Sequence, residues 1–147
     1  MKYTKILVPT DGSEFSDIGE IRALRAANEL GAKVVILSIA ETDVSFGFRY
    51  KSAASALSDA LIEESEENIE HAKEIAKDFP NVDIEYRIEK GRPASVILDT
   101  IESEDFDLLI IGSSGKSGVN KFIMGSVAER VVSHAKCDVL VIHKVKQ

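Results

Sequence analysis

The stretch Lys33–Ala40, with the sequence KVVILSIA, is the strongest fold signal in the chain. It has the length of a β-strand, and its apolar residues follow one another without the alternation that marks a strand with one face in water. Continuous apolar strands are typical of parallel sheets that helices cover on both faces. The stretch therefore predicts an α/β protein.

Four further runs of strand length lie outward from this stretch, and segments with helical spacing separate them. The runs are residues 5–10 (KILVPT), 82–88 (VDIEYRI), 107–112 (DLLIIG) and 138–143 (DVLVIH). Apolar stripes predict four helices, of which the first ends before Gly31, the second covers residues 57–76, the third begins at Pro93 and the fourth covers residues 128–135. This alternation predicts βαβ units and a parallel sheet with helices on both faces.

The run at residues 82–88 differs from the others because apolar and charged residues alternate in it. We therefore place it at an edge of the sheet. Short, right-handed connections then favour a doubly wound, five-stranded sheet with the order 3-2-1-4-5. Strands one and four are neighbours in this order, and ligands bind at their carboxyl ends, in the loops after Thr10 and Ile111. Residues 41–52 have no clear period and are interpreted as a loop, either a ligand-covering lid or a segment packed on the domain.

Composition excludes several classes of protein. The 147 residues include 18 Lys and Arg against 25 Asp and Glu, a formal net charge of −7 at pH 7. No basic stripe is present, so a nucleic-acid partner is not expected. The sequence offers no membrane span and no signal-peptide stretch. The single Cys137 has no partner for an internal disulfide, and we expect its thiol to be buried or half-buried. We expect one cytoplasmic domain covering residues 1–147.

Glycine and hydroxyl residues are concentrated after the fourth apolar run, in the sequence GSSGKSG at residues 112–118, and Gly125 and Ser126 precede the last helix. Glycine lets backbone N–H groups approach an anion because it has no Cβ. A helix N-terminus adds unpaired donors and about half a unit of positive charge. This composition is typical of a phosphate-binding loop. The alternative is a purely structural loop, in which the glycines only make a turn.

Two better-known phosphate-binding motifs do not match this loop. A P-loop needs a glycine where the chain has Ile110, and a Rossmann fingerprint needs one where it has Ser113. The spacing of Ser126 and Glu129 is that of a capping box, which predicts that the Ser126 side chain caps the last helix.

Asp11 follows the first strand, in the sequence Pro9-Thr10-Asp11-Gly12-Ser13. An acidic side chain at the carboxyl end of a strand can accept hydrogen bonds from a ribose or a base. The alternative is that Asp11 or Ser13 only caps the helix that follows.

The chain resembles the universal stress protein family over essentially its whole length. The matching segments are ILVPTDGS at residues 6–13, GRPASVIL at 91–98, DLLIIGSSGKSG at 107–118 and MGSVAERVVSHAKCDVLVI at 124–142. The family's nucleotide-binding members carry the motif Gly-x2-Gly-x9-Gly-Ser/Thr, which this sequence matches from Gly112 to Ser126. The resemblance implies a fold of the adenine nucleotide α hydrolase-like type and an ATP site.

The resemblance also implies which residues hold the adenosine. Asp11 would lie at the adenosine, Ile39 would offer backbone contacts to adenine, and Gly112 would lie at the ribose. The whole set that we expect at the nucleotide is Pro9, Thr10, Asp11, Ile39, Gly112, Ser113, Gly115, Lys116, Gly125, Ser126 and Val127.

The phosphates, by the same resemblance, would be held by Gly115, Gly125, Ser126 and the amide of Val127. Many relatives have Arg where Lys116 stands, and Lys keeps the positive charge but loses the bidentate geometry. Mg²⁺ or Mn²⁺ would arrive with the phosphates, because the histidines of this chain show no metal-ligand spacing.

A homodimer is a further implication of the resemblance, through antiparallel pairing of the last strands at residues 138–143. The sequence supports it independently, because a continuously apolar edge strand invites pairing. His143 would then lie near the interface or would be an ordinary exposed residue.

Three functions are compatible with these features. The favoured one is an ATP-binding, dimeric regulatory module of the stress response that changes its contacts with an unidentified protein partner. The others are a slow ATPase or phosphotransferase and a protein that binds AMP or adenosine without phosphate chemistry. No catalytic residue is assigned, because Asp11 and Lys116 lie in no recognisable catalytic signature.

Overall fold

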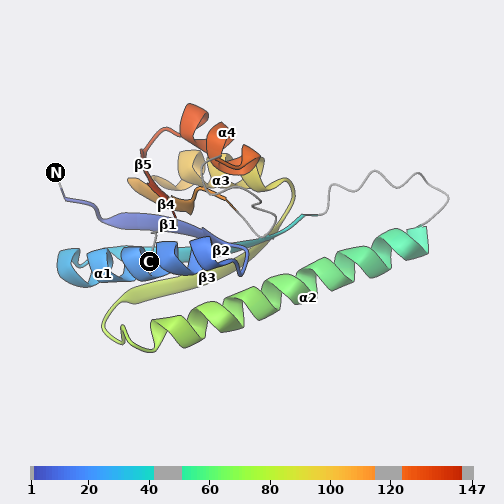
Figure 1. Cartoon of the computed structure of the whole chain (residues 1–147), viewed down its shortest axis with the longest axis horizontal. Helices are drawn as coiled ribbons and strands as arrows, with labels where there is room; N and C mark the ends of the chain where they lie inside the picture. The colour runs from blue at the N-terminus through green and yellow to red at the C-terminus, as the bar shows by residue number, and fades with distance from the viewer. Residues whose placement is uncertain (1, 42–50, 115–123, 144–147) are drawn as a thin grey trace.

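The computed structural model of the chain describes residues 2–41, 51–114 and 124–143. Strands and helices alternate along it, as the apolar runs predict (Figure 1). The elements are β1 (Lys5–Thr10), α1 (Glu14–Leu30), β2 (Lys33–Ala40), α2 (Lys51–Ala76), β3 (Asp83–Lys90), α3 (Pro93–Glu104), β4 (Leu108–Gly112), α4 (Ser126–His134) and β5 (Asp138–Ile142).

All neighbouring strands of the sheet are parallel, and their order is β3-β2-β1-β4-β5. This confirms the predicted doubly wound order, with β3 at one edge and β5 at the other. The chain leaves β1 toward β2 and β3, then crosses to β4 and β5 on the other side. The neighbours β1 and β4 therefore mark the point where the winding reverses.

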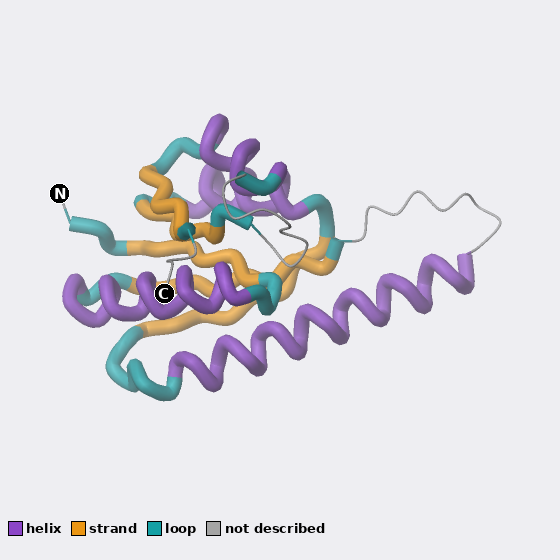
Figure 2. The backbone as a smooth tube through the Cα atoms, viewed as in Figure 1, coloured by secondary structure: helices purple, strands orange, loops and turns teal. Residues whose placement is uncertain are grey.

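Helices cover both faces of the sheet, α1 and α2 on one and α3 and α4 on the other (Figure 2). Each face has its own core. Alternate residues of β1 point to opposite faces, so that Ile6 and Val8 join the core beneath α1 and α2, whereas Leu7 joins the core beneath α3 and α4. Two cores on one sheet explain why the central strands are apolar throughout.

The helix ends follow local signals in the sequence. Gly31 ends α1 in the left-handed conformation with φ 71°, and Pro93 occupies the first turn of α3, both as predicted. Helix α2 begins at Lys51, so the last two residues of the loop predicted over residues 41–52 are helical. The rest of that loop, with its proposed lid role, lies outside the described residues. At its N-terminal end α2 runs past the sheet (Figure 1).

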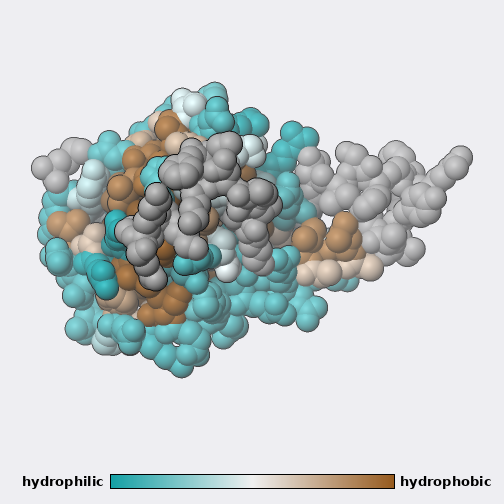
Figure 3. All heavy atoms as spheres, viewed as in Figure 1, coloured by the Kyte–Doolittle hydropathy of each residue, from teal (hydrophilic) through white to brown (hydrophobic). Residues whose placement is uncertain are grey.

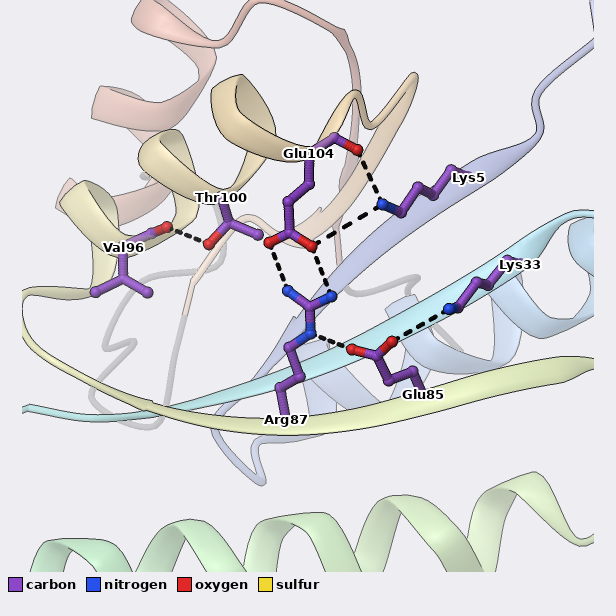
Figure 4. Close-up of polar contacts among 7 residues, drawn as sticks. All are labelled: Lys5, Lys33, Glu85, Arg87, Val96, Thr100 and Glu104. Atoms are coloured by element: carbon purple, nitrogen blue, oxygen red, sulfur yellow. Dashed lines mark hydrogen bonds and ion pairs between the residues drawn. The ribbon is translucent and has the colours of Figure 1, made fainter.

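An ion-pair network ties the edge strand β3 to α3 (Figure 4). The guanidinium of Arg87 donates to both carboxylate oxygens of Glu104, at 2.6 and 2.7 Å, and to Glu85 on its own strand. Lys33 donates to Glu85 at 3.1 Å, and Lys5 donates to the carbonyl oxygen of Glu104 at 2.9 Å. Hydrogen bonds from Arg87 hold the pKa values of both glutamates below their usual range. The network therefore links the edge strand to a helix through charged side chains.

On the face that Figure 3 shows, hydrophilic residues form the periphery and hydrophobic residues appear toward the centre. Among the described residues, the exposed large hydrophobic side chains are Ile88, Val132 and Leu140. Cys137 is half-buried, as expected, and burial raises the pKa of its thiol. None of the helices in the described part of the chain combines the length and the apolar composition that a membrane crossing requires.

Helix α1 buries a glutamate that the apolar stripe did not predict. Ile18 and Ile21 are only half-buried, whereas Glu20 is fully buried at 0% exposure. Neither of its carboxylate oxygens has a hydrogen-bond partner among the described residues. Burial, together with the neighbouring Asp17, raises the pKa of Glu20 to about 8. Asp17 itself contacts His71 of α2, with 2.9 Å between Oδ2 and Nε2.

The raised pKa of Glu20 predicts a loss of stability at alkaline pH. An unfolded chain releases the Glu20 proton above pH 4.5 or so, whereas the folded chain keeps it up to about pH 8. The free energy of unfolding should therefore fall as pH rises from about 4.5 to about 8, by a few kcal/mol. Glu20→Gln should flatten this dependence and be the more stable protein at pH 8 and above. Urea denaturation between pH 5 and 9 measures both effects.

The matched control is Glu29→Gln, at an exposed glutamate on the same helix. It should keep the pH dependence of the parent protein. Parallel pH profiles for the parent protein and Glu20→Gln would contradict the assignment of a neutral, buried carboxyl group.

Candidate functional site

A cavity opens at the carboxyl edge of the sheet, where β1 and β4 separate. Their pairing covers Ile6 with Leu108 and Leu7 with Leu109 and stops there. The Lys5 carbonyl accepts a hydrogen bond from the Asp107 amide. The backbone N–H and C=O positions of Lys5 and of alternate residues after it, including Pro9, therefore point toward β4. Proline has no N–H to continue the ladder, which explains why the strands part. The cavity between their ends has a volume of about 600 Å³, within the usual range for small-molecule sites.

The cavity brings together most of the residues that the sequence predicted at the nucleotide. Nine of the eleven line it: Pro9, Thr10, Asp11, Ile39, Gly112, Ser113, Gly125, Ser126 and Val127. The other two, Gly115 and Lys116, lie outside the described residues. The loops after β1 and β4 therefore meet at one cavity, as the strand order requires.

The turn after β1 is held by its own side chains. Asp11 Oδ1 accepts from the Ser13 amide at 2.9 Å, and the Ser13 hydroxyl caps α1 by accepting from the Ser16 amide at 3.3 Å. Ser13 therefore takes the capping role considered for Asp11 or Ser13, whereas Asp11 closes the turn that precedes the helix. Thr10 is nearly buried, and its hydroxyl donates to Ser16 and accepts from Gly12. These contacts place the Asp11 side chain at the cavity wall.

The end of β4 is held by backbone hydrogen bonds. The Ser113 amide donates to the carbonyl oxygen of Ile142 at 2.8 Å, and the Ser113 carbonyl accepts from the Gly125 amide at 2.6 Å. A Cβ on Gly112 would lie 2.7 Å from the Cβ of Phe15 in α1. Close packing at the start of α1 therefore requires glycine at position 112, whether or not a ligand binds there.

The capping box predicted for α4 does not form, which corrects the sequence analysis. Gly125 is the N-cap residue, with φ −65° and ψ 159°, and no side chain caps the helix. Ser126 is already the first helical residue, so its hydroxyl does not take the capping position. The Glu129 amide instead donates to the Gly125 carbonyl at 2.9 Å. The N-terminal amides of α4 have no side-chain cap, and Ser126, Val127 and Ala128 line the cavity.

The end of β2 forms another part of the wall. Its pairing with β1 ends at Ser38, opposite Thr10, whereas its pairing with β3 continues to Ala40. Ile39 and Ala40 therefore have a paired strand on one side only. Both line the cavity.

Acidic side chains, and no basic ones, line the described part of the cavity. Asp11, Glu41 and Glu64 supply carboxylates, and neither Lys nor Arg occurs among the lining residues. A phosphate group bound there would have to be held by backbone N–H groups and the positive end of α4. Within the described ranges, no group of three His, Cys, Asp or Glu side chains is arranged to hold a metal ion.

Sequence reasoning missed one wall of the cavity, which α2 supplies through Leu61, Glu64, Ser65 and Asn68. Their spacing places all four on one face of the helix. A signal for this wall was available. The apolar stripe of α2, which includes Leu61 and Ile69, is interrupted by Ser65 and Asn68 on the same face.

The packing of Gly112 predicts how two glycines of the motif differ. Gly112→Ala should destabilise the protein by about 1–3 kcal/mol, because the new Cβ overlaps Phe15. Gly125→Ala should change stability by less than about 1 kcal/mol, because the nearest atom to its Cβ is Ser113 O at 3.4 Å. Thermal and urea denaturation of both variants provide the measurement. Equal stabilities would show that the chain relaxes around Phe15.

Comparison with known proteins agrees with this architecture. The model of the universal stress protein family matches residues 2–143. A universal stress protein of Methanocaldococcus jannaschii is 34% identical over 145 residues, which cover 99% of this chain and 85% of the relative. The structure of one from Lactobacillus plantarum has the same fold, with a TM-score of 0.90 at 24% identity over 97% of this chain and 99% of that one. A universal stress protein solved in complex with cAMP is 27% identical, with a TM-score of 0.67 over 97% and 98% of the two chains. The chain therefore belongs to the universal stress protein family.

Proposed function

We propose that the protein is a nucleotide-binding regulatory module of the stress response that holds ATP at the carboxyl edge of its sheet. The N-terminus of α4 carries the proposal. It has no side-chain cap, and its first residues line a cavity of nucleotide size. Unpaired amides and the helix dipole together favour an anion.

The described cavity supports binding through the backbone more than through charged side chains. Asp11 and the other acidic lining residues would repel a phosphate, so the phosphate end would have to lie at α4. The adenosine would extend toward Asp11 and the end of β2, where Ile39 has a paired strand on one side only. On the basis of the sequence, we add Gly115 and Lys116 to the residues proposed to contact the phosphates. No catalytic residue is proposed.

A nucleoside monophosphate is the second candidate ligand. The universal stress protein that is 27% identical to this chain was solved with cAMP, an adenine nucleotide with one phosphate. The same cavity would take AMP without a metal ion. With ATP, we propose that Mg²⁺ or Mn²⁺ is carried by the phosphates. A regulatory protein partner and a cytoplasmic location stay expectations from the sequence.

Ser126→Pro tests the role of the α4 amides. Proline at the first helical position removes one N–H donor and is compatible with the helix, as Pro93 in α3 illustrates. Gly125 has the extended conformation that a residue before proline requires. We expect the affinity for ATP and AMP to fall about 10- to 100-fold, because one hydrogen bond to a charged group is lost. The affinity for adenosine should not change. Calorimetric titration measures all three ligands.

The control is Ser126→Ala, which removes the hydroxyl but keeps the amide. Thermal denaturation without nucleotide should show that both variants fold like the parent protein. An ATP affinity that Ser126→Pro leaves unchanged would exclude phosphate binding at α4. Absence of any bound nucleotide, after purification and on titration, would contradict the proposed function as a whole. Turnover of ATP within seconds would favour the slow ATPase instead.

We also propose a homodimer through β5 at residues 138–143. Strand β5 lies at the edge of the sheet and pairs with β4 on its inner side. Leu140 of this strand is 42% exposed. An apolar side chain on an edge strand favours pairing with a second copy, because the open edge offers backbone donors and acceptors.

Leu140→Asp is expected to give monomers, because it introduces a charge from each copy into the proposed interface. The core should be unaffected, since Leu140 is exposed. Light scattering coupled to size exclusion, at micromolar concentration, measures the mass. Ile88→Asp is the matched control, since Ile88 is the exposed hydrophobic residue of the opposite edge strand and is 37% exposed. It should leave the mass unchanged. A dimer that survives Leu140→Asp would place the interface elsewhere.

A further inference from the structure

Helix α2 presents polar side chains to the cavity, and no contact among the described residues accounts for them. Ser65 is nearly buried, at 2% exposure, and Asn68 is half-buried one turn further on. Both line the cavity. Polar side chains that line a cavity and have no partner among the described residues are placed to orient a bound ligand.

Neither side chain forms a hydrogen bond with another residue in the part of the chain that the structure describes. The hydroxyls on the α1 side differ in this respect. Thr10, Ser13 and Ser16 also line the cavity, but they bond to one another or to the backbone. The groups on α2 are therefore available to a ligand, whereas those on α1 are mostly used within the turn.

The α2 wall and the α4 N-terminus stand on opposite faces of the sheet. Helix α2 packs on β2, and α4 packs on α3 (Figure 1). The cavity joins the two faces across the strand ends. A nucleotide with its phosphates at α4 therefore directs its other end toward α2. Glu64 of α2 lines the cavity at that end and disfavours the reverse orientation, in which a phosphate would lie beside it.

We propose that Asn68, with Ser65 beside it, hydrogen bonds the edge of the base and selects adenine over guanine. This inference rests on the proposed function. An asparagine amide has a donor next to an acceptor, and adenine offers the complementary pair in its ring nitrogen N7 and its amino group N6. Guanine has two acceptors, N7 and O6, on the same edge. Whichever way the amide is turned, its oxygen would then face an acceptor.

The test compares AMP with GMP, two ligands that share the phosphate and the sugar. The parent protein should bind AMP more tightly. Asn68→Ala should reduce the ratio of AMP affinity to GMP affinity about tenfold or more, chiefly by weakening the binding of AMP. Asn68→Asp keeps the size of the side chain but removes its hydrogen-bond donor, and should weaken the binding of AMP at least as much. Ser65→Ala should shift the ratio in the same direction by a smaller factor.

Two controls separate recognition of the base from other effects. Glu67→Ala changes an exposed residue of α2 that is not part of the cavity wall, and should leave the ratio unchanged. The ratio itself corrects for any loss of folded protein, because misfolding lowers the apparent affinity for AMP and for GMP by the same factor. Thermal denaturation of Asn68→Ala without nucleotide should match the parent, since the amide has no partner to lose among the described residues.

The possible outcomes are distinct. A ratio that falls with Asn68→Ala and Asn68→Asp, but not with Glu67→Ala, supports the inference. Binding of AMP with an unchanged ratio overturns it and leaves the proposed function intact. Equal weakening of AMP and GMP also overturns it, because Asn68 would then contact the sugar or the phosphate. Failure of the parent protein to bind AMP, GMP or ATP overturns both the inference and the proposed function.

Discussion

The parting of β1 from β4 is the constraint on which the site depends. These two strands pair at Ile6 and Leu7 and then separate, because Pro9 offers no N–H toward β4. In a central parallel strand a proline would ordinarily weaken the sheet. Here it lies at the end of the strand, where the separation opens the cavity and places the turn at Asp11 against the start of α4.

The cavity has two polar regions of different chemistry. On the α4 face the donors are backbone amides, which carry no net charge. On the α2 face they are the side chains of Ser65 and Asn68, which can recognise shape and donor pattern. This division explains how a chain of net charge −7 can offer the proposed phosphate site without a basic lining in its described part.

The α1 and α2 side of the sheet carries a cost in stability. Glu20 is buried without a hydrogen-bond partner in the described residues, and its raised pKa shows that the folded protein favours the neutral form. Glu20 lies one helical turn from Ser16, which lines the cavity. Polar groups thus extend from the cavity into the core on this face, whereas the core beneath α3 and α4 is apolar around Leu109 and Ile97.

The sequence by itself determined the strands, their order, the edge position of β3 and the caps at Gly31 and Pro93. These features rest on local rules, the period of apolar residues and the backbone preferences of glycine and proline. The loops that form the cavity were predictable for the same reason, because strand order decides which loops meet. The Gly-Ser pair at the start of α4 is visible in the sequence too, but the sequence predicts Ser126 as the N-cap residue, whereas the N-cap residue is Gly125.

Only the tertiary structure decided which polar groups are left without partners. That Gly112 is required by Phe15, that Glu20 is buried and that Asn68 faces the cavity all depend on residues far away in the chain. Burial and hydrogen-bond satisfaction are properties of the packed chain, so no local pattern encodes them fully. The apolar stripe of α2 is interrupted at Ser65 and Asn68, which is visible in the sequence. Only the fold shows that both residues line a cavity.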